Sequence, residues 1–428
     1  MSVTFSTTRR AAIIAGVRTP FARSGTVFRD VSARELARFA ARELLYRTEL
    51  DGREVDEVHW GQVVASPLAP NVGREVSLLP QLPRTIPAYT VNRACASGAQ
   101  AVANAHDQII QGHADVIIAG GVESLSDVPI LHSRKMSQTL VAASKARSLG
   151  ERMALFAKLR PRDLIPVSPA IAEPSTGESM GQSAEKMAKE NGISREAQDR
   201  LALMSHQRAA AATASGRLGE EIAPWFGGRG MDEPVTTDNL IRADSSLAAL
   251  AKLRPVFDRR YGSVTAGNAS PLTDGAAACL VMNAEKARAL GYRPLATVRS
   301  YAVAAVDPGW QLLQGPAWAV PQALERAGIR WSDLGLVEIH EAFASQVLSN
   351  VQAWESKEWA AKLGRTEPVG QVDWSKTNLF GGSIAIGHPF GATGVRLVTT
   401  LANEMARRGV QFGLISICLL YTSDAADE

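Results

Sequence analysis

Cysteine is scarce in this sequence, which has three among 428 residues. Three cysteines do not make a disulfide framework, so the composition favours a reducing compartment and raises the question of whether a thiol does chemistry. An excess of charge is also missing, because 46 Lys and Arg stand against 43 Asp and Glu, which gives no sign of a nucleic-acid partner. No apolar run approaches the ~20 residues that cross a bilayer, and residues 1–10 lack the apolar core of a secretory signal. These absences together favour a cytoplasmic protein.

What remains is an ordinary globular composition, 46% hydrophobic and 21% charged. At roughly 150 residues per domain, the chain is long enough for two or three domains with their own cores. Continuous apolar runs alternate with amphipathic helical patterns, which is typical of an α/β protein whose sheets are covered on both faces. The predicted strands are 11–15, 115–119, 276–282, 336–339 and 413–418. The predicted helices are 32–46, 97–111, 195–215, 316–327 and 392–408.

One local pattern occurs twice. Cys95 stands in a small-residue turn before a helix and a buried strand, and His388 stands in a similar turn before the last predicted helix and strand. Such units are common in α/β proteins, so the likeness alone leaves an internal duplication open. Residues 125–239 differ, because they are rich in helix formers, proline and charge and have few strand candidates. We interpret them as an excursion from the first α/β unit, which resumes near Ile241.

Cys95 is a candidate nucleophile. Small residues surround it in the sequence NRACASGA, and an apolar helical pattern begins directly afterwards. A cysteine at the N-terminus of a helix faces unpaired backbone N–H groups and the positive end of the helix dipole, both of which stabilise a thiolate. The alternative is a buried, inert cysteine. Cys279 lies inside an apolar run and is interpreted as structural.

Two histidines stand where catalytic groups occur. His388 lies in GGSIAIGHPFGATG, whose glycines allow tight turns and a close approach to a ligand. No Gly-Lys-Ser/Thr follows and the pattern is not G-x-G-x-x-G, so a nucleotide-binding loop is rejected. A histidine in this loop can be the base that activates a thiol, and a structural turn histidine is the alternative. His340 follows a predicted strand, a common place for an α/β active site, and a satisfied core histidine is the alternative.

The sequence spacing indicates no metal site. His340 begins HEAFA, which departs from H-E-x-x-H because position 344 is alanine. His106 and His113 have no partner at ligand spacing, and no Cys/His cluster suggests zinc. Cys418 ends the predicted strand GLISIC, and its local pattern favours a buried structural cysteine.

Five segments resemble the thiolase family in their order and spacing. They are the stretch around Cys95, GGVES at 120–124, VTAGNASPLTDGAAA at 264–278, HEAF at 340–343 and GGSIAIGHPFGATG at 381–394. The resemblance runs from about residue 11 to residue 418. Within the family, the sequence is most similar to the β-subunit of the fatty-acid oxidation multienzyme (trifunctional) complex. That likeness rests on His340 where most thiolases have Asn, and on the segments 145–167 and 241–259.

The resemblance implies a thiolase-like five-layered αβαβα fold of two similar halves with an inserted helical loop domain. It places the first half at 1–124 and 240–285, the loop domain at 125–239 and the second half at 286–418. It also implies cleavage of a 3-ketoacyl-CoA by CoA, giving acetyl-CoA and a shortened acyl-CoA in fatty-acid β-oxidation. No metal or redox cofactor is implied, because CoA is a substrate and the thioester itself stabilises the enolate.

The resemblance also assigns roles to residues. Cys95 matches the nucleophile, His388 the activating histidine and Cys418 the acid/base, while His340 takes the place of the Asn that helps to position a water at the first oxyanion hole. The positions that match the lining of the CoA site are Arg242, Ser270, Met180 and Phe343. A biosynthetic acetoacetyl-CoA thiolase would use the same residues and is the nearest alternative. A non-catalytic acyl-CoA-binding or scaffold subunit is a further alternative of a different class.

Partners are implied in the same way. The resemblance implies a homodimer that assembles with an α-subunit carrying hydratase and dehydrogenase activities. Residues 145–167 interleave basic with apolar side chains, a pattern that can dock on a membrane surface or on a partner. The alternative is a solvated helix that packs on the loop domain.

The C-terminus departs from the family. Thiolases follow the second cysteine with a Gly-rich turn and a closing strand, whereas residues 419–428 contain no glycine. In the family a backbone N–H of that turn contributes to the second oxyanion hole, and losing such a donor costs on the order of 10²–10³ in rate. We therefore predict that 419–428 is an aberrant tail, the product of a truncation, frameshift or assembly error, and that it weakens this chain. A missing strand would also leave a sheet edge uncovered.

Overall fold

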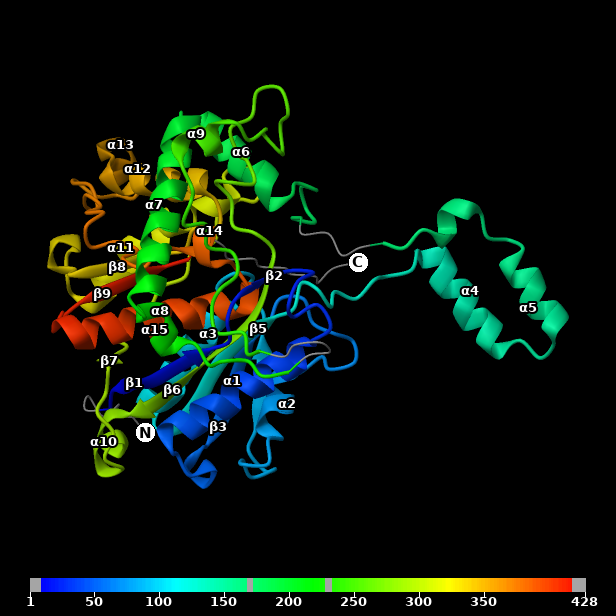
Figure 1. The fold of residues 1–428 in the computed structure, drawn as a ribbon, viewed down its shortest axis with the longest axis horizontal. Coiled ribbons are helices and arrows are strands. Elements are labelled where there is room, and N and C mark those ends of the chain that lie inside the picture. The colour runs from blue at the N-terminus through cyan, green and yellow to red at the C-terminus, as the bar shows by residue number, and fades with distance from the viewer. Residues whose placement is uncertain (1–8, 168–171, 228–232, 418–428) are drawn as a thin grey trace. The chain divides into compact units, whose positions relative to one another are not determined.

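A seven-stranded sheet forms the centre of the first half in the computed structural model, which describes residues 9–167, 172–227 and 233–417 (Figure 1). β3 runs parallel to β4 and β5, whereas β6 is antiparallel to both β5 and β1. Every residue of β5 and β6 is buried, as their continuous apolar runs predict. The strand order is β4 (Ala88–Val91), β3 (Glu57–Gly61), β5 (Val116–Glu123), β6 (Thr273–Asn283), β1 (Ala11–Arg18) and β7 (Ala296–Thr297), with β2 (Ala22–Arg23) paired to β6.

Helices cover both faces of this sheet. On one face, α1 (Ala33–Thr48) and α2 (Val72–Ser77) share a core with Leu280 of β6. On the other face, α3 (Ser97–Gln111) and α15 (Phe390–Arg408) share a core with the next residue, Val281. Successive side chains of a strand point to opposite faces, so β6 supplies both cores.

A smaller sheet follows on the other side of α15. β8 (Leu336–Ile339) pairs in parallel with β9 (Gly413–Ser416), and α15 contacts both strands. The far face of this sheet shares a core with α11 (Pro316–Ala327) and α12 (Ala344–Glu355). The layers therefore follow the order helix, sheet, helix, sheet, helix, which confirms the expected five-layered αβαβα fold.

Glycines let the two central helices approach each other closely. A Cβ atom on Gly98 of α3 would lie 2.4 Å from the carbonyl oxygen of Gly391, and one on Gly394 of α15 would lie 2.3 Å from the backbone nitrogen of Ala99. Contacts this short exclude any side chain at both positions. The close packing brings the N-terminal ends of α3 and α15 together, which are the ends that carry Cys95 and His388.

The structure assigns the region expected to form a loop domain, 125–239, partly to a small compact unit and partly to the main unit. Residues 128–172 form a small compact unit, with α4 (Arg134–Lys145), α5 (Leu149–Phe156) and the 3₁₀ turn η2 (Pro161–Leu164). The stretch 145–167 is thus two short helical segments rather than one helix. The following helices belong to the main unit. They are α6 (Met180–Glu190), α7 (Arg195–Ala214) and α8 (Arg217–Glu221).

Every strand and helix predicted from the sequence is present, with ends that differ by a few residues. The sequence did not predict β3 and β4, because polar residues such as His59 and Thr90 interrupt their apolar pattern. Among the described residues, no helix is long and apolar enough to cross a membrane. The other α-helices are α9 (Leu247–Ala251), α10 (Ala284–Ala289), α13 (Lys357–Lys362) and α14 (Ser383–Ile386).

The second sheet has an open side within the described part of the chain. There β9 pairs only with β8, and an apolar cavity of about 290 Å³ lies between β9 and residues 298–303. Residues such as Val298, Leu401 and Ile415 line this cavity. Cys418 and the predicted aberrant tail at 419–428 lie outside the described residues, so the expectation about the chain's ending stays a prediction.

Candidate active site

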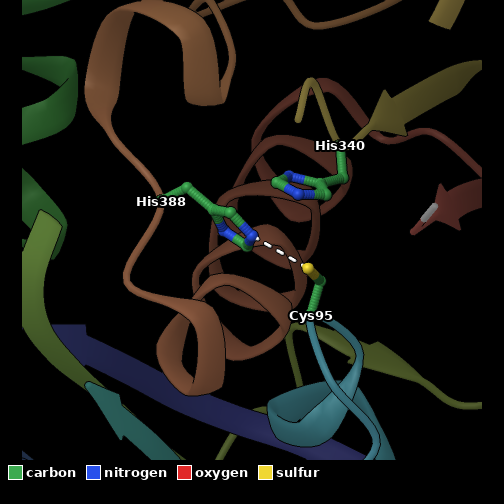
Figure 2. Close-up of side chains that lie close together, drawn as sticks. All are labelled: Cys95, His340 and His388. Atoms are coloured by element: carbon green, nitrogen blue, oxygen red, sulfur yellow. Dashed lines mark hydrogen bonds between the residues drawn. The ribbon is translucent and has the colours of Figure 1, made fainter. Parts of the chain in front are cut away.

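Cys95 lies in a tight turn directly before α3 (Figure 2). Its neighbour Ala94 has a left-handed backbone with φ of 42°, a conformation that costs free energy for any residue other than glycine. Asn92 and Ser97 hold this turn, because Asn92 Oδ1 accepts the Ala94 N–H at 3.0 Å and the Ser97 hydroxyl donates to the Ala94 carbonyl at 2.6 Å. The N-cap residue Ala96 has no capping side chain, so the positive end of the α3 dipole acts beside the sulfur.

His388 contacts Cys95 directly. Its Nε2 lies 3.0 Å from Cys95 Sγ, and its ring is buried (Figure 2). Two threonines fix the residue from the other side. The Thr393 hydroxyl lies 2.6 Å from Nδ1, and Thr273 Oγ1 accepts the backbone N–H of His388 at 3.0 Å.

The hydrogen bonds of Thr393 determine which nitrogen of His388 carries the proton. The Thr393 hydroxyl donates its single hydrogen to the Pro389 carbonyl at 3.0 Å. It therefore accepts at its oxygen, and the hydrogen between it and His388 belongs to Nδ1. Neutral His388 consequently has an unprotonated Nε2, which accepts the thiol hydrogen of Cys95. This is the arrangement of a thiol and its general base.

His340 completes the cluster from the carboxyl end of β8. Its ring centroid lies 4.1 Å from that of His388, and its Nδ1 lies 2.9 Å from the hydroxyl of Ser383. The side chain is fully buried. Burial, together with the neighbouring His388, lowers the pKa of His340 to about 3, against a smaller opposing effect of Cys95. His340 is therefore neutral at physiological pH and does not serve as a base there.

A buried carboxyl ties the two turns together, and the sequence analysis did not single it out. Glu123 at the end of β5 accepts the N–H of Gly391 at 3.1 Å, of Val63 at 3.0 Å and of Val64 at 2.9 Å. Burial raises the pKa of Glu123 to about 7, although these N–H groups oppose the shift. An acidic residue that ends a fully apolar strand was the signal available in the sequence.

The other predicted site residues are distributed unevenly. Met180 and Phe343 are partly buried and pack against the same buried cluster as Cys95. Ser270 is adjacent, because its N–H donates to the carbonyl of Ala342 at 2.8 Å. The backbone N–H of Arg242 donates to His206 Nδ1 at 3.2 Å. The proposed CoA-binding roles of these residues stay predictions.

The structure brings together a donor set that spacing along the sequence did not reveal. One ligand atom from each of Cys95, His340 and His388 lies within 4.8 Å of the others. Thiolate and imidazole are zinc ligands, so these residues are able to hold a metal ion. The expected catalysis without a metal is a separate prediction, and it remains one.

Comparison with known proteins identifies the family. The family models of the thiolase N-terminal domain and the thiolase C-terminal domain match residues 11–285 and 292–426. The chain therefore belongs to the thiolase family, and it is an acyltransferase.

Curated relatives and solved structures agree with this family. The 3-ketoacyl-CoA thiolases of Cronobacter sakazakii (strain ATCC BAA-894) and Escherichia coli (strain 55989 / EAEC) are each 50% identical over 410 residues, which cover 96% of this chain and 94% of each relative. The crystal structure of the Bacillus anthracis acetyl-CoA acetyltransferase has a TM-score of 0.81 at 33% identity and covers 96% of both chains. Human mitochondrial 3-ketoacyl-CoA thiolase has a TM-score of 0.80 at 32% identity, covering 97% of this chain and 96% of the other.

Proposed function

We propose that this chain is a 3-ketoacyl-CoA thiolase, which cleaves a 3-ketoacyl-CoA with CoA through an acyl-thioester on Cys95. The observation that carries the proposal is the 3.0 Å contact between Cys95 Sγ and His388 Nε2 beside the N-terminus of α3. Relatives that share half of its residues over nearly the full chain bear that name.

The reaction begins with a proton transfer. The Cys95 thiol gives its proton to Nε2 of His388, whose Nδ1–H stays bonded to Thr393, and the sulfur attacks the keto carbon. The carbon–carbon bond then breaks, so that the acyl group stays on sulfur and the enolate of acetyl-CoA leaves. In this proposal Cys418 protonates that enolate. CoA then gives its thiol proton to the Cys418 thiolate, the resulting CoA thiolate takes the acyl group, and the freed Cys95 thiolate regains its proton from His388.

In this mechanism His340 helps to stabilise the oxyanion and does not transfer a proton. Its pKa of about 3 keeps the ring neutral, which leaves His388 as the base next to the sulfur. A water held by His340 and a hydrogen bond from protonated His388 would stabilise the tetrahedral oxyanion. Fixed donors of this kind are worth about 10²–10³ in rate each.

The acyl chain that the site accepts separates the proposed reaction from its nearest alternative. A biosynthetic acetoacetyl-CoA thiolase would use the same three residues, and the similarity to an acetyl-CoA acetyltransferase supports keeping this alternative. We place the CoA substrate against Met180 and Phe343, which pack against the same buried cluster as Cys95, with Ser270 and Arg242 at its margin. The human mitochondrial 3-ketoacyl-CoA thiolase has also been solved in complex with CoA, at 32% identity to this chain.

The small unit at 128–172 is the proposed docking element. On α5, Leu149 and Met153 are 75% and 64% exposed, with the basic Arg152 between them. Exposed apolar side chains next to basic ones favour contact with a membrane surface or a protein partner over a solvated role. We propose that this unit contacts an α-subunit of a cytoplasmic β-oxidation complex built on a thiolase homodimer. Unchanged complex formation and membrane recovery after deletion of residues 145–167 would remove this part of the proposal.

The test of the function is thiolysis of 3-ketoacyl-CoA substrates with short, medium and long chains. Longer substrates should be cleaved with higher kcat/KM than acetoacetyl-CoA. A strict preference for acetoacetyl-CoA would instead favour the biosynthetic alternative. Cys418→Ala should still form the acyl-enzyme from a simple acyl-CoA and lose carbon–carbon cleavage. Binding of CoA without any acylation of Cys95 would support a scaffold subunit.

A further inference from the structure

The cluster of Cys95, His340 and His388 contains the donor atoms of a metal site as well as the reactive groups of a catalytic site. One ligand atom of each residue lies within 4.8 Å of the others, and Cys95 Sγ lies 3.0 Å from His388 Nε2 (Figure 2). The three residues come from separate segments of the chain, namely the turn before α3, the end of β8 and the turn before α15. The fold therefore holds the three ligand atoms together around one point.

A hydroxyl group lies within hydrogen-bond distance of Nδ1 in each imidazole ring and orients that ring. Thr393 contacts Nδ1 of His388 at 2.6 Å, and Ser383 contacts Nδ1 of His340 at 2.9 Å. With both Nδ1 atoms engaged, the Nε2 atoms are the ones left for a ligand, and the buried side chain of His340 also interacts with Cys95. A hydrogen bond to the second ring nitrogen is what orients a metal-binding histidine.

A tetrahedral ion requires the ligand atoms to move, because their separations extend up to 4.8 Å and the widest must close to about 3.5 Å. Zn–S and Zn–N bonds of about 2.3 and 2.0 Å hold sulfur and nitrogen about 3.5 Å apart. The observed separation of Cys95 Sγ from His388 Nε2 is 3.0 Å, so the pair must open by about half an ångström, which a side-chain rotation provides. Cys95 is only half-buried while both histidines are buried, so an ion can reach the sulfur from solvent and meet the nitrogens behind it.

We propose that Zn²⁺ binds reversibly to Cys95 Sγ, His340 Nε2 and His388 Nε2, and that it competes with acylation. The Cys95 thiol releases its proton to the buffer, the sulfur and the two nitrogens each donate an electron pair to the ion, and a water takes the fourth position. No atom is oxidised or reduced. The occupied sulfur no longer attacks a substrate, and the occupied nitrogen no longer accepts a proton, so the loaded enzyme is inactive.

The donor set also predicts which ions compete. Soft thiolate with imidazole selects Zn²⁺, Co²⁺ and Cd²⁺, whereas Mg²⁺ and Ca²⁺ prefer oxygen ligands. Mg²⁺ at concentrations far above those of Zn²⁺ should therefore leave acylation unchanged. His340 is the residue that turns a thiol–base pair into a three-ligand site.

The test is a titration of the full-length, chelator-treated protein with Co²⁺ and then with Zn²⁺. Co²⁺ should produce a thiolate-to-cobalt charge-transfer band at one equivalent, and Zn²⁺ should displace it. His340→Asn should weaken Zn²⁺ binding by roughly 100-fold or more, since even loss of an outer partner of a ligand costs 10–100-fold. Cys95→Ser should lose the band, and the control His113→Asn, at an exposed histidine, should keep both band and affinity.

The outcomes separate this proposal from the proposed function. Acyl transfer is measured on the same preparation with the chelator present, so a failure of catalysis shows itself without any metal. A charge-transfer band that persists in Cys95→Ser, or an affinity that His340→Asn leaves unchanged, would overturn the metal site. So would the absence of Zn²⁺ binding in a protein that is readily acylated.

Discussion

Two turns of related design face each other in this molecule, one before α3 and one before α15. Each precedes a helix whose N-cap residue, Ala96 or Pro389, has no capping side chain. Cys95, in the first turn, is half-buried and follows the left-handed Ala94. His388, in the second turn, is only 3% exposed and is held at Nδ1 by a hydroxyl.

The two turns differ because one holds the nucleophile and the other holds the base. A nucleophile has to meet the substrate, so the first turn presents the sulfur at the edge of solvent and accepts backbone strain to do so. A base has to keep one tautomer and one orientation, so the second turn buries the ring and fixes its proton. Cys279 shows the opposite case, because its complete burial in β6 raises the pKa of its thiol to about 12.

The largest effect should come from removing the base in the second turn. His388→Asn should lower the rate of Cys95 acylation by about 10²–10⁴, because the thiol then loses the base that accepts its proton. Acylation by an acyl-CoA, followed in single-turnover experiments across pH, measures this. Recovery of much of the lost rate at high pH, where solvent removes the proton, is expected. An unchanged rate at neutral pH would contradict the role of His388.

A smaller effect should come from separating the two turns. Gly98→Ala would place a Cβ 2.4 Å from the Gly391 carbonyl oxygen and push α15 away from α3. A displacement of about 1 Å between reacting groups costs up to 10²-fold, so the acylation rate should fall roughly 10- to 100-fold. Gly219→Ala is the matched control, because no atom lies within 4 Å of the Cβ it would add in α8. Equal rates in the two variants would contradict the packing argument.

Removing only the group that fixes the tautomer of His388 should lower the rate by a smaller factor. Thr393→Val removes the hydroxyl that accepts Nδ1–H of His388 and leaves the ring in place. We expect a fall of about 10-fold in kcat, corresponding to roughly one net hydrogen bond, with little change in KM. Thr393→Ser keeps the hydroxyl and should restore most of the rate. If the serine and valine variants behave alike, the hydroxyl does not orient the base.

An effect on stability rather than on rate should be seen against pH, at the carboxyl that joins the turns. The folded pKa of Glu123 is about 7, above its ordinary value of 4.5, so the folded protein keeps a proton that the unfolded chain loses. The contribution of Glu123 to the free energy of unfolding is therefore largest below pH 4.5. It falls by on the order of 3 kcal/mol as the pH rises from 4.5 to about 7. Glu123→Gln cannot ionise, so its melting temperature relative to that of the wild type should rise between about pH 4 and about pH 8. A difference that does not change with pH would contradict this account.

The alternation of strands and helices was predictable because it depends on apolar patterns within short segments. The two turns were predictable as candidates, since a cysteine at a helix start and a histidine among glycines are local features. Their contact was not, because Cys95 and His388 are 293 positions apart and each had a plain structural alternative. The supporting groups Glu123, Thr393 and Ser383 were missed for the same reason, since their roles depend on partners brought by the fold.

The loop-domain bounds of 125–239 stay a prediction, and the compact unit at 128–172 within them was beyond local reasoning. Helix-forming composition is the same in a helix that packs on the main unit, such as α7, and in one that belongs to the separate unit at 128–172, such as α4. Only tertiary packing separates them. The layer order was available through the family resemblance and not through periodicity, which reports the faces of single elements.

The most direct test of the central claim is the intact mass of the purified chain after incubation with an acyl-CoA, followed by peptide mapping. One acyl group is expected on Cys95, none on Cys279 and none in Cys95→Ala. An adduct on Cys279, or a folded protein that acquires no acyl group at all, would contradict the assignment of the turn before α3 as the site of the nucleophile.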